Sequence, residues 1–177
     1  MIQLPHAVGR PVVQANVPIV AEDVHVGWFS LATEKKAVAI YTDANDYNVV
    51  QIAAEMLADD VERVTGLRPL HQAVGSLPKD ACIVSGTLGK SQLVDRLVKS
   101  LEIDVSGIRG KWESYIITTV QQPEGNAPLL LVIGSDRRGT AFGLTSLSEA
   151  IGVSPWYWWA DVKPLRIKPV KTYPRKG

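Results

Sequence analysis

The sequence predicts an α/β domain, in which a mixed β-sheet carries about three helices packed mainly on one face. Short apolar and β-branched segments alternate with longer segments whose apolar residues recur every three or four positions. In the second half of the chain, two such short segments are separated by a turn, which is typical of an antiparallel hairpin. With 177 residues, the chain is long enough for one domain and too short for two ordinary ones.

The first expected elements are two short strands. The segment HVGWFSLAT, residues 25–33, is compatible with a strand, and AVAIYT, residues 37–42, is an apolar run that ends at Asp43. Residues 1–24 contain three prolines, few charges and no clear period, which predicts an extended lead-in. A single domain is therefore expected over residues 25–162.

The strongest helical pattern lies in residues 45–66, NDYNVVQIAAEMLADDVERVTG. Asn45 or Asp46 is placed to cap the start of the helix, and Gly66 stands where a left-handed C-cap is expected. Apolar residues at three- and four-residue steps predict one buried face. That face comprises Val49, Ala53, Met56, Leu57, Val61 and Val64.

The remaining elements continue the alternation. ACIVSG, residues 81–86, is expected to form a buried strand, and SQLVDRLVKSLEI, residues 91–103, an amphipathic helix. The hairpin is expected from residues 112–122 and 129–134, and a third helix from residues 139–152. Strands and helices in this order indicate a mixed sheet with its helices outside.

The last segment of the chain, residues 163–177, is KPLRIKPVKTYPRKG. It contains three prolines and six basic residues, which is typical of a linker or a trimmed end. No stretch of the chain approaches the roughly 18 apolar residues of a membrane span. The N-terminal segment lacks the apolar core of a secretory signal, so localisation stays open.

The composition argues against several kinds of partner and cofactor. The net charge is +1, so a concentrated positive field that would favour nucleic acid or a membrane surface is not indicated. The single cysteine, Cys82, excludes an internal disulfide and lies in the apolar run ACIV, where a buried, inert thiol is expected. The three histidines are scattered without metal-ligand spacing, so we expect no metal and no cofactor.

One glycine-rich turn, SGTLGKS at residues 85–91, resembles a phosphate-binding loop. That pattern requires a glycine five residues before Gly89, and Val84 occupies the position. Gly86 and Gly89 are therefore expected to form a structural turn between a strand and a helix.

A second glycine-rich turn opens GSDRRGTAFG, residues 134–143. The dinucleotide-binding spacing is absent, since Asp136 stands at its second glycine position. The residues of interest are Gly134, Asp136, Arg137, Arg138 and Gly139. Asp136 is expected to cap the following helix, and the two arginines to pair with it or with a partner; anion binding at the helix start is the alternative.

The stretch SPWYWWADV, residues 154–162, gathers three of the five tryptophans and one of the five tyrosines. Such a cluster can stack on sugars or bases, or fill an interface between domains. Bases are least expected without a basic stripe, but composition does not separate sugar contact from interdomain packing. The candidate contact residues are Trp156, Tyr157, Trp158, Trp159 and Asp161, and we expect no catalytic residue among these motifs.

Several blocks together resemble glycoside hydrolase family 115, the xylan α-glucuronidases. The longest is LLLVIGSDRRGTAFGLTSLSEAIGVSPWYWWADV, and IAAEMLADDVERVTGLRP, VSGTLGKS and VSGIRGKWESY precede it in the family's order. The resemblance runs from about residue 25 to residue 162. It implies a bacterial enzyme that removes (4-O-methyl)glucuronic acid side chains from xylan, and members of the family are often exported.

The resemblance also implies which part of such an enzyme this chain is. Family members are several times longer and open with an α/β domain similar to the non-catalytic N-terminal domain of β-hexosaminidases and other α-glucuronidases. A (β/α)8 barrel follows and carries the catalytic acids, so no catalytic residue transfers to this chain. Residues 163–177 would then lead toward the missing barrel, which is the expected partner, and xylan-derived oligosaccharide is a second candidate.

Two alternative functions remain open at the level of the sequence. The chain could be a free-standing carbohydrate-binding module that uses the aromatic residues 156–159. It could also self-associate as a dimer through the same aromatic surface.

Overall fold

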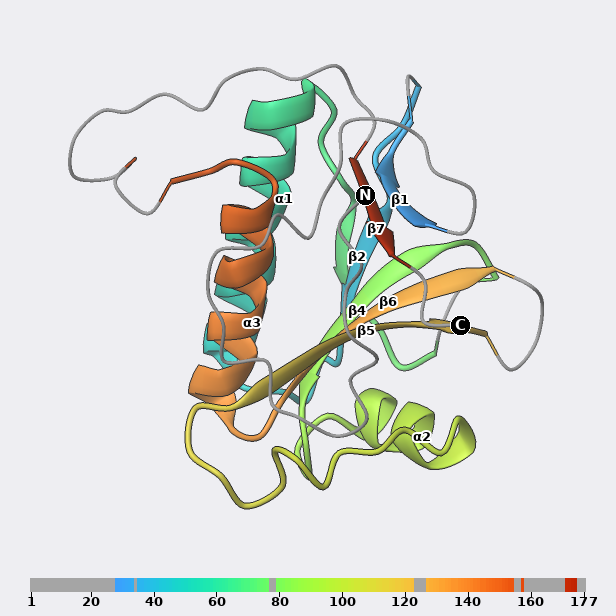
Figure 1. Ribbon diagram of the computed structural model, residues 1–177, viewed down its shortest axis with the longest axis vertical. Helices are drawn as coiled ribbons and strands as arrows, with labels where there is room; N and C mark the ends of the chain where they lie inside the picture. Colours follow the sequence, from blue (N-terminus) through green and yellow to red (C-terminus); the bar gives the residue numbers. More distant parts are fainter. Residues whose placement is uncertain are drawn as a thin grey trace.

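The computed structural model describes residues 28–33, 35–76, 79–122, 127–154, 157 and 171–174. A five-stranded mixed sheet, in the order β3-β2-β4-β6-β5, forms the centre of the domain (Figure 1). Its strands are β2 (Ala39–Thr42), β3 (His71–Ala73), β4 (Cys82–Thr87), β5 (Tyr115–Gln121) and β6 (Pro128–Gly134).

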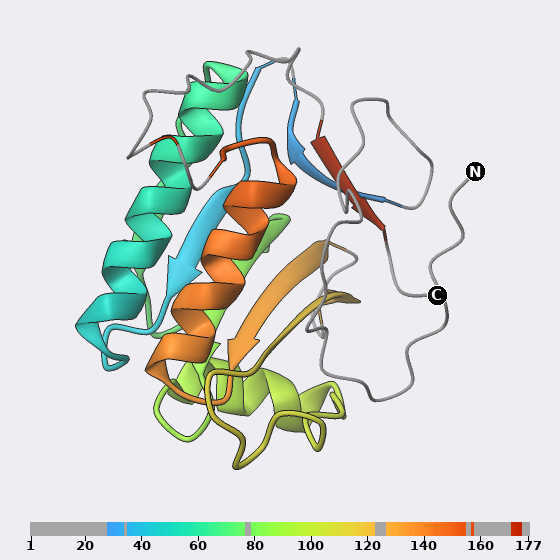
Figure 2. The same cartoon turned by 60° about the vertical axis from the view of Figure 1, so that its left-hand side comes forward.

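Three helices cover the sheet in the described residues: α1 (Asn48–Thr65), α2 (Gln92–Ser100) and α3 (Arg137–Ala150). Helices α1 and α3 lie side by side over one face, and α2 lies over the other (Figure 2). The predicted α/β class, with a mixed sheet and helices mainly on one face, is confirmed. None of the helices in these described parts is long and apolar enough to cross a membrane.

The strand order creates a switch point in the sheet. Strands β3, β2, β4 and β6 run parallel, and β5 runs antiparallel to β6, which confirms the predicted hairpin. The chain passes from β2 through α1 to β3 on one side, and then returns to place β4 on the other side of β2. In open α/β sheets, ligands usually bind outside the carboxyl ends of the strands at such a point. The carboxyl edge of the sheet at β2 and β4 is therefore the expected position of a ligand site.

Each face of the sheet has its own core. Ile40, Ile83 and Leu130 point toward α1 and α3, whereas Cys82 and Leu131 point toward α2. All five are essentially inaccessible to solvent, in keeping with strands that are covered on both faces. Their near-continuous apolar runs explain why the central strands were evident from the sequence.

The face of α1 that is buried differs from the predicted face at two positions. Val49 and Met56 are 37% and 36% exposed, although the sequence pattern places them in the core. The positions that are buried instead are Val50, Ala54 and Ala58. The buried stripe of α1 is thus centred on Val50, Ala54, Leu57 and Val61, which places Val49 and Met56 at its margins.

The cap predicted at the C-terminal end of α1 is confirmed, whereas the caps predicted at its N-terminal end are not. Gly66 ends the helix in the left-handed conformation, with φ at 77°, as predicted. Neither Asn45 nor Asp46 caps the start, since Tyr47 holds the N-cap position and makes no side-chain cap bond. The carboxylate of Asp46 instead accepts a hydrogen bond from the N–H of Thr87, at the end of β4.

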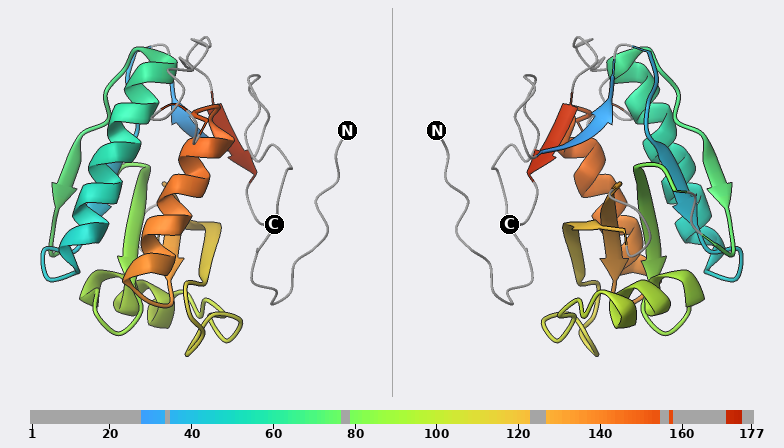
Figure 3. Two further views of the ribbon diagram at one scale, coloured as in Figure 1. Left: turned by 90° about the vertical axis from the view of Figure 1, so that its left-hand side faces the viewer. Right: turned by 90° about the vertical axis from the view of Figure 1, so that its right-hand side faces the viewer.

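A second, two-stranded sheet joins β1 (Trp28–Ala32) to β7 (Lys171–Pro174) in antiparallel register. Figure 3 shows this pair of strands beside the main sheet. β1 lies within the strand expected at residues 25–33. β7 forms inside the segment predicted as a linker, so the described part of that segment contains a strand. The division into lead-in, domain and tail otherwise stays a prediction.

Candidate functional site

Three aspartates lie at the carboxyl edge of the sheet. Asp43 follows β2 directly, Asp46 lies in the turn before α1, and Asp136 follows β6. Each carboxylate accepts hydrogen bonds from backbone N–H groups, and two of the three bind segments more than 40 residues away. The edge that usually receives a ligand is thus occupied by side chains of the chain itself.

Asp43 joins the end of β2 to the start of α2. Its Oδ2 accepts a hydrogen bond from the N–H of Leu93 at 2.9 Å, and its Oδ1 accepts one from the N–H of Asn45 at 2.9 Å. Burial of this carboxyl favours its neutral form, but the N–H groups of Asn45, Leu93 and Gln92 outweigh burial, so the pKa of Asp43 lies below its ordinary value. Asp43 therefore caps α2 together with Ser91, whose hydroxyl accepts from the N–H of Val94.

Asp46 joins the end of β2 to the end of β4. Its Oδ2 accepts a hydrogen bond from the N–H of Thr87 at 2.7 Å, and its Oδ1 accepts one from the N–H of Tyr47 at 2.7 Å. Burial raises the pKa of Asp46 above its ordinary value in spite of these two bonds, and the nearby charge of Asp43 acts in the same direction. This carboxyl sits in the switch point between β2 and β4.

Asp136 caps α3, as the sequence predicts. Its Oδ1 accepts from the N–H groups of Arg138 and Gly139 at 2.9 and 2.8 Å, and its Oδ2 accepts from the N–H of Glu113 at 2.8 Å. Burial opposes ionisation, but these N–H groups prevail, so the pKa of Asp136 lies below its ordinary value. The start of α3 is therefore filled by an internal anion.

The two arginines after Asp136 have different surroundings. Arg138 pairs with Glu113, with Nη1 and Oε1 2.9 Å apart, and its guanidinium lies over the ring of Phe142. Arg137 is exposed and forms no ion pair with another residue in the described ranges. Neither arginine forms an ion pair with Asp136 in this part of the chain; Arg138 instead contacts Glu113 and Phe142, and the pairing expected for Arg137 is not seen among the described residues.

The two glycine-rich turns pack against each other. The N–H of Leu88 donates to the carbonyl of Gly134 at 2.9 Å, and the hydroxyls of Thr87 and Thr140 are 2.8 Å apart. A Cβ on Gly134 would lie 2.2 Å from the backbone N of Thr140, so no side chain fits there. The glycines allow close packing of strand, turn and helix, which agrees with a structural turn.

The surrounding structure also requires glycine at the other glycine positions of these turns. A Cβ on Gly139 would lie 2.3 Å from the carbonyl oxygen of Ser114, and one on Gly86 would lie 2.6 Å from Oγ of Ser91. Gly89 instead needs a left-handed backbone, with φ at 72°. These glycines serve packing and turn geometry, whereas a phosphate-binding loop would require its backbone amides to face a ligand.

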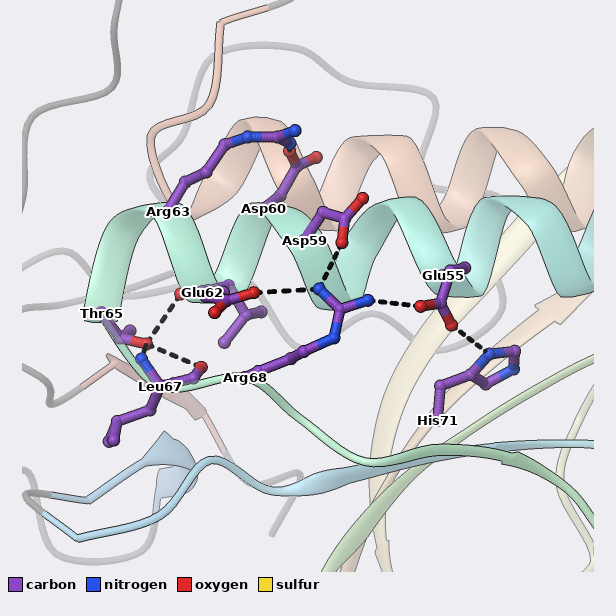
Figure 4. Close-up of polar contacts among 10 residues, drawn as sticks. Glu55, Asp59, Asp60, Glu62, Arg63, Thr65, Leu67, Arg68 and His71 are labelled. Carbon is purple, nitrogen blue, oxygen red and sulfur yellow. Dashed lines mark hydrogen bonds and ion pairs between the residues drawn. The ribbon is translucent and has the colours of Figure 1, made fainter.

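Among the described residues, the largest cluster of ion pairs lies on the outer surface of α1 (Figure 4). Arg68, in the loop after α1, pairs with Glu55, Asp59 and Glu62, which stand on one stripe of the helix. The acids are 39–51% exposed and Arg68 is 42% exposed, so each pair is weakened by water. The cluster ties the loop before β3 to α1, and we interpret it as structural.

Glu55 also reaches His71 on β3, with Oε2 and Nδ1 2.9 Å apart (Figure 4). The other ring nitrogen of His71 lies 3.2 Å from Oγ1 of Thr42. Hydroxyl, imidazole and carboxylate thus follow one another in the order of a nucleophilic triad. Thr42 is fully buried and its hydroxyl also binds Gln51, so a substrate has no access to it. The sequence does not reveal this arrangement of Thr42, His71 and Glu55, because the three residues are far apart in the chain.

Of the predicted aromatic cluster, only Tyr157 lies within the described residues. Its ring packs partly buried against the core under α1 and α3, and the guanidinium of Arg63 lies 5.0 Å from the ring centroid. A cation over one ring face leaves little of that face for a sugar. Trp156, Trp158, Trp159 and Asp161 lie outside the described residues, and the contacts predicted for them stay predictions.

Two single residues differ sharply in their exposure to solvent. Cys82 is buried, as predicted, and burial raises the pKa of its thiol to about 12, which keeps it protonated and inert. Trp112 was not singled out by the sequence and is 86% exposed, the largest exposure of any large apolar residue in the described ranges. Within those ranges, no group of three or more metal-ligating side chains is placed to hold an ion.

These features define a small α/β domain whose carboxyl edge is closed by its own side chains. No family model and no curated protein matches the chain. Among solved structures, the chain is similar to a family GH115 4-O-methyl-α-glucuronidase with specificity for decorated arabinogalactans. The TM-score is 0.63 at 30% sequence identity, and the match covers 80% of this chain. It covers 17% of that chain, so the likeness is to one part of a much longer enzyme.

Proposed function

We propose that this chain is the non-catalytic N-terminal domain of an α-glucuronidase-like glycoside hydrolase, and that it packs against and supports a (β/α)8 barrel. The observation that carries the proposal is the likeness to 17% of a GH115 enzyme over 80% of this chain. The reaction of the whole enzyme would be removal of (4-O-methyl)glucuronic acid from a polysaccharide. Xylan is the polysaccharide that the sequence resemblance suggests, and decorated arabinogalactan is the one for which the similar enzyme is specific.

The absence of catalysis in this domain is supported by the carboxylates at the sheet edge. Hydrolysis of a glycosidic bond needs two carboxyl groups that face the sugar from about 5–9.5 Å apart. Asp43, Asp46 and Asp136 each accept at least two backbone hydrogen bonds, which hold their oxygens inside the fold. A carboxylate that is bound in this way caps and joins elements of the fold, which is a structural role.

The proposal is tested by incubating the folded chain with oligosaccharides from glucuronoxylan and from glucuronidated arabinogalactan. We expect no release of uronic acid above a heat-denatured control. Release would overturn the non-catalytic role, and Asp136→Asn and Asp161→Asn would then identify the acid involved. A second measurement concerns the gene: a reading frame that continues into a barrel supports the proposal, and a stop codon directly after Gly177 contradicts it.

A further inference from the structure

His71 joins three elements of the fold through its two ring nitrogens. Nδ1 lies 2.9 Å from Oε2 of Glu55 on α1 (Figure 4), and Nε2 lies 3.2 Å from Oγ1 of Thr42 on β2. The ring itself stands on β3, which is an edge strand of the five-stranded sheet. Because the His71 side chain is only 12% exposed, the protonation state of the ring depends on these two neighbours.

The amide of Gln51 fixes the direction of the hydrogen bonds around Thr42. Nε2 of Gln51 donates to the carbonyl of Asp43 at 2.8 Å, which leaves Oε1 facing the hydroxyl of Thr42. The reverse orientation of the amide would place two oxygens against each other at that distance. An amide oxygen can only accept, so the single hydroxyl proton of Thr42 is donated to Gln51. Oγ1 of Thr42 is therefore an acceptor toward Nε2 of His71.

On its other side, the ring meets a second group that can only accept. The pKa of Glu55 lies below its ordinary value, because a hydrogen bond from His71 and another from Arg68 outweigh the effect of burial. An ionised carboxylate has no proton to donate. Both ring nitrogens of His71 thus face acceptors, and only the imidazolium form has a proton on each nitrogen.

The charges around His71 also favour a cation. From α1 and the loop after it, the ring faces Glu55 and, beyond it, Arg68 with the other two acids of its cluster. These three carboxylates and one guanidinium have a net charge of −2 before His71 is counted. On β2, the carboxylate of Asp43 is bound to the N–H of Leu93 at the start of α2. A positive charge on the largely buried ring is thus balanced by the acids of α1.

We infer that His71 is held as an imidazolium ion and acts as a pH-sensitive latch, which fastens the edge strand β3 to α1 and β2. The latch is the row of hydrogen bonds through Glu55, His71, Thr42 and Gln51. Loss of either ring proton leaves two acceptors facing each other in this row, which removes one hydrogen bond and adds a repulsion. β3 is three residues long, so its backbone pairing with β2 offers little to replace the lost bond. The latch does not depend on the proposed function.

The direction of the pH effect follows from the form of the ring that the fold binds. Imidazole ordinarily changes charge near a pH of about 6.5, and a fold that binds the charged form is stabilised by it below that pH. The contribution of His71 to the free energy of unfolding is then lost as pH rises and the ring of the folded protein gives up its proton. β3 is therefore fastened in mildly acidic solution and released in alkaline solution.

The protonation of the ring is tested by 15N NMR of the histidine side chains in the full chain. The chain has three histidines, and His71→Gln identifies the signals of His71. In the acidic part of a titration from about pH 5 to 9, both ring nitrogens should have the chemical shift of protonated nitrogen. Glu55→Gln and Thr42→Val should each lower the proton affinity of the ring about tenfold, because each weakens one hydrogen bond of the imidazolium ion.

Two further variants are the matched controls for that titration. Glu62 pairs with Arg68 and is about as exposed as Glu55, whereas Glu55 pairs with both Arg68 and His71. Glu62→Gln should therefore leave the proton affinity of His71 nearly unchanged. Thr42→Ser keeps the hydroxyl and should restore the affinity that Thr42→Val loses. Equal losses from the two glutamate variants, or equal affinities in the two threonine variants, overturn the imidazolium assignment.

Amide hydrogen exchange tests whether the charged ring fastens β3. At the two ends of this strand, the N–H of Ile40 donates to the carbonyl of Leu70 and the N–H of Val74 to that of Thr42, both at 2.8 Å. Corrected for the intrinsic rate, the protection of both amides should fall about tenfold between about pH 6 and 8.5.

The same fall in protection should be absent from His71→Gln, in which no ring titrates at this position. Should that variant fail to fold, Glu55→Gln takes its place, because Glu55 is half-exposed and its replacement should move the fall to lower pH. Protection that stays constant with pH in the unmodified chain, or that falls equally in the variant, overturns the latch.

Discussion

The carboxylate of Asp43 accepts a hydrogen bond from the backbone N–H of Leu93 at 2.9 Å, across 50 residues of sequence. This bond fastens α2 to the end of β2 and fills the helix N-terminus with an internal anion. The same edge of the sheet holds Asp46 and Asp136 in similar roles. At this edge, carboxylates of the chain itself therefore occupy the switch point of the sheet.

Replacing this carboxylate should destabilise the domain without changing its shape. Asp43→Asn retains one acceptor oxygen but turns an NH2 group toward a backbone donor. We expect a loss of about 1–3 kcal/mol in the free energy of unfolding, since a buried N–H is left unpaired. Urea denaturation measures it, with the exposed Glu149→Gln as the control. A loss no larger than that of the control would show that the bond contributes little.

The packing of the glycine-rich turns predicts that substitution by alanine destabilises the domain much more at one glycine than at another. Gly139→Ala places a Cβ 2.3 Å from the carbonyl oxygen of Ser114, so the backbone must move, and we expect a loss of roughly 1–3 kcal/mol or more. Gly75→Ala meets nothing within 4 Å and should change stability by less than about 0.5 kcal/mol. Thermal denaturation of the two variants compares them directly. Equal midpoints would contradict the close contact between α3 and the turn before β5.

The pKa directions at the sheet edge predict opposite pH effects for two aspartates. The pKa of Asp136 is lowered in the folded state. Its contribution to the free energy of unfolding is therefore complete above the ordinary aspartate pKa of about 3.9, and is lost as pH falls through the folded-state pKa. Asp46 has a raised pKa, so the folded state holds an extra proton just above pH of about 3.9, and ionisation of Asp46 lowers stability as pH rises.

Stability measured from about pH 2 to 7 distinguishes the two cases. Asp136→Asn should lessen the loss of stability in acid, relative to the unmodified chain. Asp46→Asn should make stability rise more steeply with pH just above about 3.9. Identical pH profiles for both variants would show that the two carboxyls do not have opposite shifts.

The charge cluster on α1 should have a small effect that depends on salt. Arg68→Met keeps much of the side-chain length but leaves Glu55, Asp59 and Glu62 to repel one another along the helix. Because these groups are 39–51% exposed, we expect a loss of about 1 kcal/mol or less, which shrinks toward zero in about 1 M salt. Lys99→Met is the control. A loss that persists in high salt would instead indicate an apolar contribution of the Arg68 stem.

The register of α1 is tested by adjacent residues. Leu57 is 1% exposed, and Leu57→Ala should cost about 2–5 kcal/mol. Met56 is 36% exposed, and Met56→Ala should cost about 1 kcal/mol or less. The free energy of unfolding in urea compares the pair. A larger loss of unfolding free energy for Met56→Ala would indicate that Met56 belongs to the buried face of α1, as the sequence pattern predicts.

Local features of the domain follow from the sequence alone. The apolar runs of the central strands, the hairpin, the left-handed cap at Gly66 and the cap at Asp136 all depend on residues close together in the chain. Periodicity and capping chemistry act over a few residues, so a single sequence carries their signals. The α/β class followed from the order of these local elements.

Tertiary structure decided how those elements meet. The sequence offers Asp46 as a helix cap, but the strand order brings the N–H of Thr87, 41 residues away, to its carboxylate. The exposure of Met56 depends on which face of α1 meets α3 and the sheet, and Trp112 lies in a turn that is held by the segment around Asp136. Contacts across tens of residues arise only when the sheet has assembled, because no local period or cap encodes which distant backbone group a carboxylate will find.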